Sequence, residues 1–86
     1  MIRIGFAPQF TRKFKALDSE LQIEVKEKVE LFKNPANHTQ LKVHKLHGKL
    51  KNCCSFSVNY KIRVVFQYED KKTITCLNLG DHEIYK

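Results

Sequence analysis

Alternating hydrophobic and polar positions open the chain and then give way to helical spacing. The first apolar positions are Ile2, Ile4 and Phe6. Their period of two predicts a short strand with one buried face. Pro8, a residue favoured in the first turn of a helix, follows directly. Phe10, Phe14 and Leu17 then recur at helical spacing, which predicts a short amphipathic helix.

A second helix is indicated before Pro35. The segment Ser19-Glu20-Leu21-Gln22 has the pattern of a capping box, which predicts the start of a helix. Its apolar stripe consists of Leu21, Val25, Val29 and Phe32. Glu24 and Lys28 lie four residues apart in the favourable order, so we expect this pair to support the helix from its solvent side. Asn34-Pro35 ends the helix.

Three strands are predicted in the second half of the chain, after a polar connector. The first has Cys54, Phe56 and Val58 on one face and Ser55, Ser57 and Asn59 on the other. The second has Ile62, Val64, Phe66 and Tyr68 in alternation. Arg63 should therefore project from the face opposite this apolar row. Glu69-Asp70-Lys71-Lys72 is a predicted turn, and a third strand rich in β-branched residues follows from Thr73 to Leu79.

This order of strand, two helices and three strands predicts a two-layer α+β fold, β-α-α-β-β-β, as one domain over residues 1–86. We expect a helix hairpin packed on one face of a mostly antiparallel sheet. The other face is then left free. Ser55, Ser57, Arg63 and the segment from His44 to Lys51 are the candidates to line it, and we expect the functional site there.

The sequence offers little support for a membrane-spanning segment or a metal site. No apolar run approaches the roughly 20 residues that span a bilayer, and the first residues do not resemble a signal peptide, so we expect a cytoplasmic protein without membrane contact. The three cysteines Cys53, Cys54 and Cys76 are expected to be reduced. Zinc is the alternative, but the spacing His44-x-x-His47 stands alone. We predict no metal and no cofactor.

Positive charge is concentrated in the middle of the chain. The net charge is +7, and residues 31–68 contain no Asp or Glu. The basic residues of this stretch are Lys33, Lys42, Lys45, Lys49, Lys51, Lys61 and Arg63. Such segregation attracts polyanions. A solvated basic face that aids solubility is the alternative.

The segment Val43 to Lys51 combines two histidines and three lysines around one glycine. RNA cleavage by the 2′-hydroxyl needs groups that move protons and groups that stabilise the charged phosphorane. Histidine titrates near neutrality, whereas lysine and arginine bind phosphate. His44, His47, His82 and Arg63 are thus candidates for this chemistry. Each histidine can equally be an ordinary surface residue, and Tyr60 and Tyr85 can stack on bases or serve as core or rim.

Three motifs in order carry a family resemblance: Leu46-His47-Gly48-Lys49-Leu50-Lys51, the run from Phe56 to Phe66, and Leu79-Gly80-Asp81-His82-Glu83-Ile84-Tyr85. The chain resembles the RelE/ParE toxin superfamily over essentially its whole length. The closing Gly-x-His-x-x-Tyr is most similar to the YafQ-type branch of the RelE ribonucleases. The resemblance implies a type II toxin that cleaves mRNA, usually on the ribosome, and that a cognate antitoxin protein silences.

The resemblance also implies roles for single residues. His44 corresponds to the polar catalytic residue before the Leu-x-Gly motif, and Arg63 to the strand arginine at the scissile phosphate. His82 corresponds to a general acid or base, and Tyr85 to an aromatic residue that places the RNA. The implied basic rim that binds RNA consists of Lys45, His47, Lys49, Lys51 and Lys61.

Three positions depart from the family pattern. The YafQ-type branch has a histidine at the place of Ser57 and an acidic residue at that of Lys61, and many members carry arginine at that of Asn78. Roles are therefore expected to be redistributed. Two alternatives remain open: a ParE-like toxin that inhibits DNA gyrase by binding, against which His44 and His82 argue, and a non-catalytic RNA-binding module.

Overall fold

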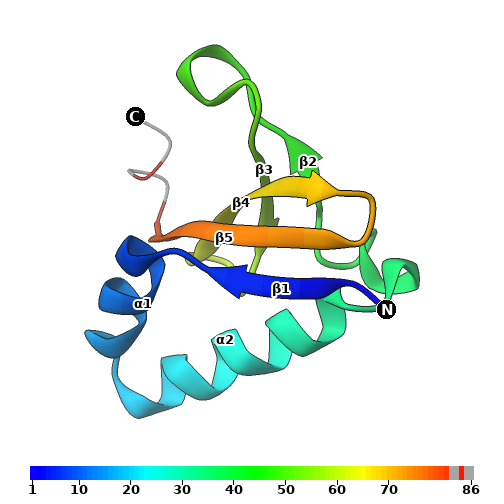
Figure 1. Cartoon of the computed structure of the whole chain (residues 1–86). Coiled ribbons are helices and arrows are strands. Elements are labelled where there is room, and N and C mark those ends of the chain that lie inside the picture. Colours follow the sequence, from blue (N-terminus) through cyan, green and yellow to red (C-terminus); the bar gives the residue numbers. More distant parts are fainter. Residues whose placement is uncertain (82–83, 85–86) are drawn as a thin grey trace.

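Two helices pack beneath a twisted five-stranded sheet (Figure 1). The computed structural model describes residues 1–81 and residue 84. The strands are β1 (Arg3–Phe6), β2 (His44–Lys45), β3 (Cys54–Ser57), β4 (Arg63–Asp70) and β5 (Thr73–Gly80), and they lie in the order β1-β5-β4-β3-β2. β1 runs parallel to β5, and the other neighbours are antiparallel. The predicted α+β fold with a mostly antiparallel sheet is confirmed.

The helices α1 (Pro8–Lys15) and α2 (Ser19–Phe32) begin and end close to where the sequence indicates. The N-cap of α2 is Asp18, one residue before Ser19, the residue at which the predicted capping box begins. Asp18 Oδ1 accepts a hydrogen bond from the backbone N–H of Leu21 at 2.9 Å. Past the end of α2, the short helix η1 (Pro35–Asn37) turns the chain. The Asn37 side chain then donates to the Leu31 carbonyl, which also accepts from the Asn34 backbone N–H, and the His38 ring binds the Phe32 carbonyl.

The main core lies between the sheet and the helices. Alternation along the strands places Phe56, Val64 and Phe66 toward α2, as predicted. Val25, Val29 and Phe32 of α2 complete this layer, and the Phe32 ring stacks on Phe56 at 5.0 Å between centroids. The apolar stripe of the helix and the period-two strands thus meet as the pattern indicates.

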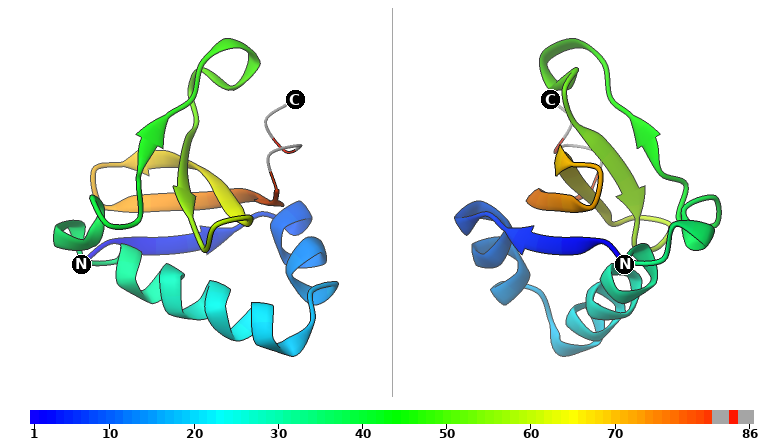
Figure 2. Two further views of the ribbon diagram at one scale, coloured as in Figure 1. Left: turned by 180° about the vertical axis from the view of Figure 1, so that it is seen from behind. Right: turned by 45° about the vertical axis from the view of Figure 1, so that its right-hand side comes forward.

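The sheet face away from the helices is less open than the sequence suggests. Leu46, Cys53 and Val65 are buried there, and Leu50, Leu77 and Ile84 pack against them. The loop between β2 and β3, which contains the short helix η2 (Gly48–Leu50), supplies several of these side chains and projects away from the helix layer (Figure 2). Ser55, expected at this face, is fully buried. The expectation of a free face is therefore wrong for its centre.

Two boundaries also differ from the prediction. A strand of two residues, β2, precedes the three predicted strands and adds one antiparallel edge, because His44 and Lys45 pair with Ser55 and Cys54. β4 extends through Asp70, so the turn contains Lys71 and Lys72 only. The Asp70 carboxylate accepts a hydrogen bond from the backbone N–H of Lys72 at 2.8 Å, and this bond lowers the pKa of Asp70. Within residues 1–81, no helix has the length and apolarity needed to cross a membrane.

Candidate functional site

Two adjacent rows of residues cross the sheet on the face away from the helices. In one row His44 lies opposite Ser55, Ser55 opposite Val65, and Val65 opposite Asn78. In the next row Ser57 lies opposite Arg63, and Arg63 opposite Gly80. Residues directly opposite one another in a sheet share a face. The register therefore brings the predicted residues His44 and Arg63 to one face, with backbones about 12 Å apart from the spacing of strands and residues.

The imidazole of His44 is exposed and oriented by a backbone carbonyl. Its Nδ1 lies 2.9 Å from the Lys42 carbonyl oxygen. A carbonyl oxygen only accepts hydrogen bonds, so Nδ1 carries the proton of a neutral ring and Nε2 is the nitrogen that can accept another. Lys42 itself has φ 58°, in the left-handed region that non-glycine residues rarely occupy. The strained Lys42 backbone thus aims the carbonyl that holds His44.

The guanidinium of Arg63 is held in a similar way. Its Nη1 donates a hydrogen bond to the Asn59 carbonyl at 2.8 Å, and the side chain is half-buried. It lines a pocket of about 260 Å³ that also includes Lys28 and Lys42. A neutral carbonyl positions the guanidinium without neutralising its charge. Arg63 is therefore placed to bind an anion.

The predicted basic rim divides between opposite ends of β3. His47, Lys49 and Lys51 lie in the β2–β3 loop and are exposed. Lys61 lies in the turn between β3 and β4, where its backbone N–H donates to the Asn59 side chain. Lys45 is exposed on β2, but it pairs with Cys54 and so alternates with His44 to the opposite sheet face. The rim is thus not one continuous patch on one face.

The segment after β5 holds the last of the predicted site residues. Two predicted site residues of this segment, His82 and Tyr85, lie outside the described residues. Ile84 packs against the buried cluster around Val65. A Cβ added at Gly80 would lie 2.7 Å from Ile84 Cγ2, so a side chain at this position would displace Ile84.

The three positions that depart from the family pattern lie close to the candidate site. Ser57 and Asn78 belong to the two rows that cross the sheet, and Lys61 lies in the turn before β4. Ser57 is half-buried directly opposite Arg63. Asn78 lies opposite Val65, and its Oδ1 accepts a hydrogen bond from the Leu79 backbone N–H at 2.9 Å. Lys61 is in the turn that leads into Arg63. These positions surround the candidate site without adding a second arginine to it.

His38 and the cysteines have structural surroundings. The His38 ring stacks on Phe32 at 4.2 Å between centroids and binds the Phe32 carbonyl, so it stabilises the end of α2. Cys53, Cys54 and Cys76 are free thiols, and burial raises the pKa of Cys76 to about 12. Among the described residues no three His, Cys, Asp or Glu side chains gather as metal ligands would.

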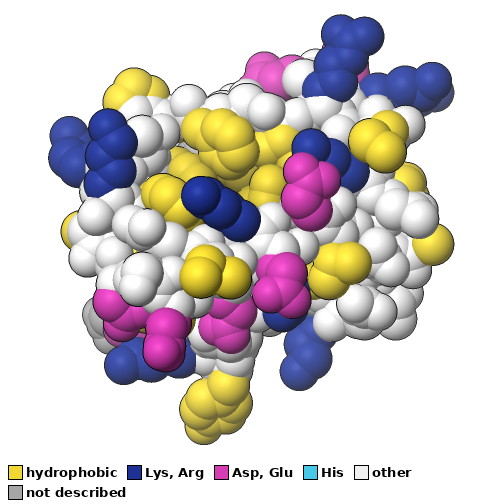
Figure 3. All heavy atoms as spheres, turned by 90° about the horizontal axis from the view of Figure 1, so that it is seen from below, with side chains coloured by type: hydrophobic (Ala, Val, Ile, Leu, Met, Phe, Trp, Pro, Cys, Tyr) yellow, Lys and Arg dark blue, Asp and Glu magenta, His cyan; other side chains and the backbone are white. Residues whose placement is uncertain are grey.

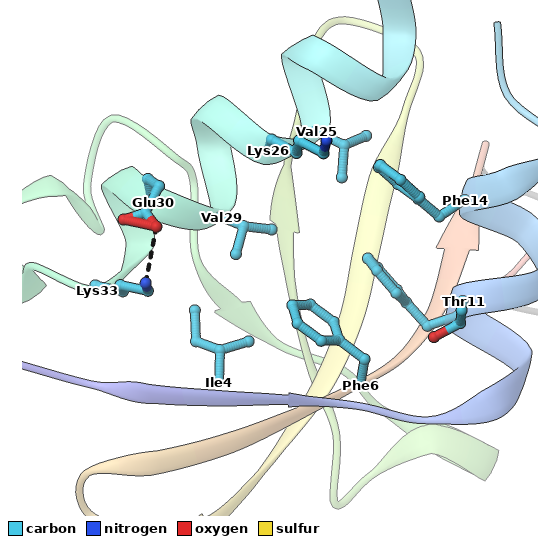
Figure 4. Close-up of a pocket in the computed structure, with 10 residues that line it drawn as sticks. Ile4, Phe6, Thr11, Phe14, Val25, Lys26, Val29, Glu30 and Lys33 are labelled. Atoms are coloured by element: carbon cyan, nitrogen blue, oxygen red, sulfur yellow. Dashed lines mark hydrogen bonds and ion pairs between the residues drawn. The ribbon is translucent and has the colours of Figure 1, made fainter. Parts of the chain in front are cut away.

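A second hollow lies on the helix side of the molecule, between β1, α1 and α2 (Figure 3). It measures about 570 Å³ and is mostly apolar. Ile4, Phe6 and Phe14 point into it across from Val25 and Val29, as Figure 4 shows. We call it the apolar groove.

The rim of the apolar groove is polar. The Lys26 ammonium lies 5.9 Å from the centroid of the Phe14 ring, and Lys33 forms an ion pair with Glu30 at 2.8 Å (Figure 4). Phe6, predicted on the buried face of its strand, is 50% exposed because nothing among the described residues covers that side of the groove. Lysines beside an exposed aromatic floor suit an acidic, apolar partner.

Sequence reasoning missed Lys28, Lys42 and Asn59. Lys28 was assigned to a solvent-side pair with Glu24, but Glu24 Oε1 instead accepts from the Asn59 side chain at 2.6 Å. That bond links residues 35 apart, so no local pattern reveals it. The lack of acidic residues from 31 to 68 was the one signal that included Lys42.

Several solved structures share the fold of this chain over nearly their whole length. YafQ from E. coli strain BL21(DE3) superposes with a TM-score of 0.79 at 15% identity, covering 98% of this chain and 97% of that one. A chain of the YoeB-YefM complex from Staphylococcus aureus gives 0.73 at 22%, covering 95% and 98%. The conserved hypothetical protein HP0894 from Helicobacter pylori gives 0.73 at 23%, covering 96% and 97%. The fold is therefore that of the RelE-like toxin class.

Sequence comparison narrows this class to a family. Residues 5–82 match the family model described as RelE-like toxin of type II toxin-antitoxin system HigB. The chain belongs to this HigB-like family of RelE-like toxins. No curated protein matches the chain. The predicted membership of the RelE/ParE superfamily is thus confirmed.

Proposed function

We propose that this protein is an endoribonuclease toxin that cleaves mRNA, on the ribosome, without a metal. The observation that carries the proposal is the orientation of His44 on the same sheet face as Arg63, each held by a backbone carbonyl. Family membership supports the toxin part of the proposal. The chemistry rests on the side chains at this face.

In the proposed reaction the 2′-oxygen of one nucleotide attacks the adjacent phosphorus, and its proton passes to a general base. The bond from phosphorus to the 5′-oxygen breaks, and a general acid protonates the leaving oxygen. One of the two histidines, His44 through Nε2 or His82, acts as the general base and the other as the general acid. Arg63 stabilises the charge on the phosphorane. Tyr85 helps to place the RNA. The products are a 2′,3′-cyclic phosphate and a 5′-hydroxyl.

RNA binding beyond the cleavage point is assigned to the lysines. His47, Lys49 and Lys51 in the β2–β3 loop and Lys61 at the other end of β3 are exposed, so phosphates can reach them. Lys45 extends from the edge strand β2. The divided rim implies that RNA passes along β3 rather than across a flat patch.

A cleavage assay with mRNA and ribosomes in the presence of EDTA tests the proposal. The wild type should cut and leave cyclic phosphate ends, whereas Arg63→Ala should be at least about 100-fold slower and His44→Ala about 100- to 10,000-fold slower. His82→Ala should be slowed similarly. Arg12→Ala in α1 is the control with the same charge change and should cut like the wild type.

Absence of cutting by the wild type would refute the endoribonuclease, and equal cutting by all variants would refute the roles proposed for His44, Arg63 and His82. Inhibition of DNA gyrase instead would support a ParE-like toxin. RNA binding without cutting would support a non-catalytic module. Cutting, gyrase inhibition and RNA binding without cutting therefore distinguish the three functions that the sequence left open.

The proposed partner is a cognate antitoxin, and its proposed docking site is the apolar groove. The neighbouring folds include the YoeB-YefM complex and the toxin-antitoxin complex RelBE2 from Mycobacterium tuberculosis. An antitoxin segment with apolar side chains for Phe6 and carboxylates for Lys26 fits the exposed floor and basic rim.

Phe6→Ser should therefore weaken antitoxin binding about 10-fold or more, measured by calorimetry on the co-expressed pair after separation. Tyr68, also a half-exposed aromatic residue at 45%, lies outside the groove, so Tyr68→Ser is the matched control. Equal affinity of the two variants would place the antitoxin elsewhere.

A further inference from the structure

The pocket beside Arg63 collects positive charge from three separate parts of the chain. Lys28 comes from α2, Lys42 from the segment before β2, and Arg63 from the start of β4. The pocket measures about 260 Å³, and none of the described residues that line it is acidic. Like charges gathered in a small hollow repel one another. The arrangement is therefore one that a bound anion would stabilise.

The charges of the pocket are not satisfied by neighbouring carboxylates. Among the described residues neither Lys28 nor Lys42 forms an ion pair, and Glu24, four positions before Lys28 on α2, is hydrogen bonded to Asn59. Arg63 donates to a neutral carbonyl. Because lysine and arginine bind phosphate oxygens through charge-assisted hydrogen bonds, a phosphodiester suits this pocket.

An exposed aromatic ring at the pocket suits the base of a nucleotide as well as its phosphate. Tyr60 lines the pocket and is 96% exposed, the largest exposure of any aromatic residue that the structure describes. Its position in the turn between β3 and β4 leaves the ring without packing. Aromatic rings beside basic grooves stack on the unpaired bases of single-stranded nucleic acids.

The pocket is physically linked to the candidate catalytic residues. Lys42 lines it, and the Lys42 carbonyl holds the His44 ring at 2.9 Å. Arg63 belongs both to the pocket and to the sheet face that carries His44. An RNA strand that places its scissile phosphate at Arg63 therefore brings its neighbouring nucleotide to the pocket.

We propose that this pocket is a nucleotide subsite for single-stranded RNA, in which Lys28 and Lys42 bind the phosphate next to the scissile one and Tyr60 stacks on its base. The inference rests on the proposed function, which makes RNA the substrate. It adds Lys28, Lys42 and Tyr60 to the residues that bind it. Lys28 is the sharpest probe, because it lines this pocket from α2 and has no part in the apolar groove or in the sheet face that carries His44.

Binding of a short 2′-O-methyl oligoribonucleotide, which cannot be cut, tests the subsite apart from catalysis. Lys28→Gln should weaken binding about 5-fold in fluorescence anisotropy, and the slope of log affinity against log salt should fall by about 0.7. Tyr60→Ala should weaken binding about 5- to 100-fold, and Tyr60→Phe should restore it. Lys15→Gln, at an exposed lysine in the last turn of α1 that lines neither the pocket nor the apolar groove, is the matched control and should bind like the wild type.

The outcomes separate the subsite from the proposed function. Unchanged affinity in Lys28→Gln and Tyr60→Ala, or no binding by the wild type, would overturn the subsite, and cleavage of mRNA by the wild type would then leave the proposed function intact. Conversely, binding that depends on Lys28 and Tyr60 in a protein that cuts no RNA would support the subsite and refute the endoribonuclease. Circular dichroism melting curves check that each variant folds.

Discussion

The Asn59 side chain ties the turn before Arg63 to α2. Its Oδ1 accepts hydrogen bonds from the backbone N–H groups of Lys61 and Ile62, each at 2.8 Å. Its Nδ2 donates to Glu24 Oε1 at 2.6 Å, and its backbone carbonyl holds Arg63. Exchange of Asn59 for aspartate keeps the two acceptor bonds but replaces the donor with a second carboxylate oxygen. The change thus tests one bond.

The expected cost of Asn59→Asp follows from two terms. Loss of a hydrogen bond to a charged group costs about 1.5–3 kcal/mol. Repulsion of two carboxylates at 4 Å adds about 1 kcal/mol in water and about 4 kcal/mol at an effective dielectric constant of 20. Both side chains are half-buried and can move apart, so we expect a total of about 2–4 kcal/mol. That is a large part of the roughly 5–15 kcal/mol that stabilises a typical domain.

Urea unfolding of Asn59→Asp, Glu24→Gln and the double variant measures the contribution. In the double variant the amide introduced by Glu24→Gln can donate to the new carboxylate, so stability should recover by about 1–3 kcal/mol relative to Asn59→Asp. Added salt should also reduce the cost of Asn59→Asp. An Asn59→Asp variant within about 0.5 kcal/mol of the wild type, or a double variant no more stable than Asn59→Asp, would refute the reasoning.

Three further predictions concern the core and the sheet face. Burial raises the pKa of Cys76 from its ordinary 9.0 to about 12. The stability that the neutral thiol contributes is therefore complete below pH 9 and is lost as the pH rises toward 12. Between these pH values the free energy of unfolding of the wild type should fall by about 1.4 kcal/mol per pH unit more steeply than that of Cys76→Ala. Phe32→Ala, at a fully buried ring, should cost about 3–5 kcal/mol in urea unfolding. Gly80→Ala should displace Ile84 and increase hydrogen exchange at Val65.

Local patterns predicted the layers of the fold but not its complete sheet. The period-two runs around Phe56 and Val64 and the stripe ending at Phe32 identified the core because each depends on neighbours in sequence. β2 has only two residues, His44 and Lys45, and is too short to show any period. Its pairing, and the parallel pairing of β1 with β5, depend on residues far apart in the chain.

The candidate site was predictable in its charges and not in its contacts. His44 and Arg63 were chosen by residue type and family pattern, and the register places them on one sheet face. Lys28 was assigned to an i,i+4 pair because the helix pattern alone favours it. In the fold the Glu24 carboxylate instead accepts a hydrogen bond from the Asn59 side chain, and Lys28 lines the pocket. A local rule could not anticipate a bond between residues 35 apart.

Both oriented groups of the site are held by carbonyls rather than by carboxylates. An aspartate beside Arg63 would fix the guanidinium equally well, but its charge would compete with the phosphate that we propose binds here. An aspartate on His44 would raise the affinity of the ring for a second proton and so favour the form that cannot act as a base. The carbonyls of Asn59 and Lys42 orient these side chains without placing a negative charge beside them. The left-handed backbone at Lys42 fits the proposed function, because backbone strain is tolerated where it aims a functional group, here the carbonyl that orients His44.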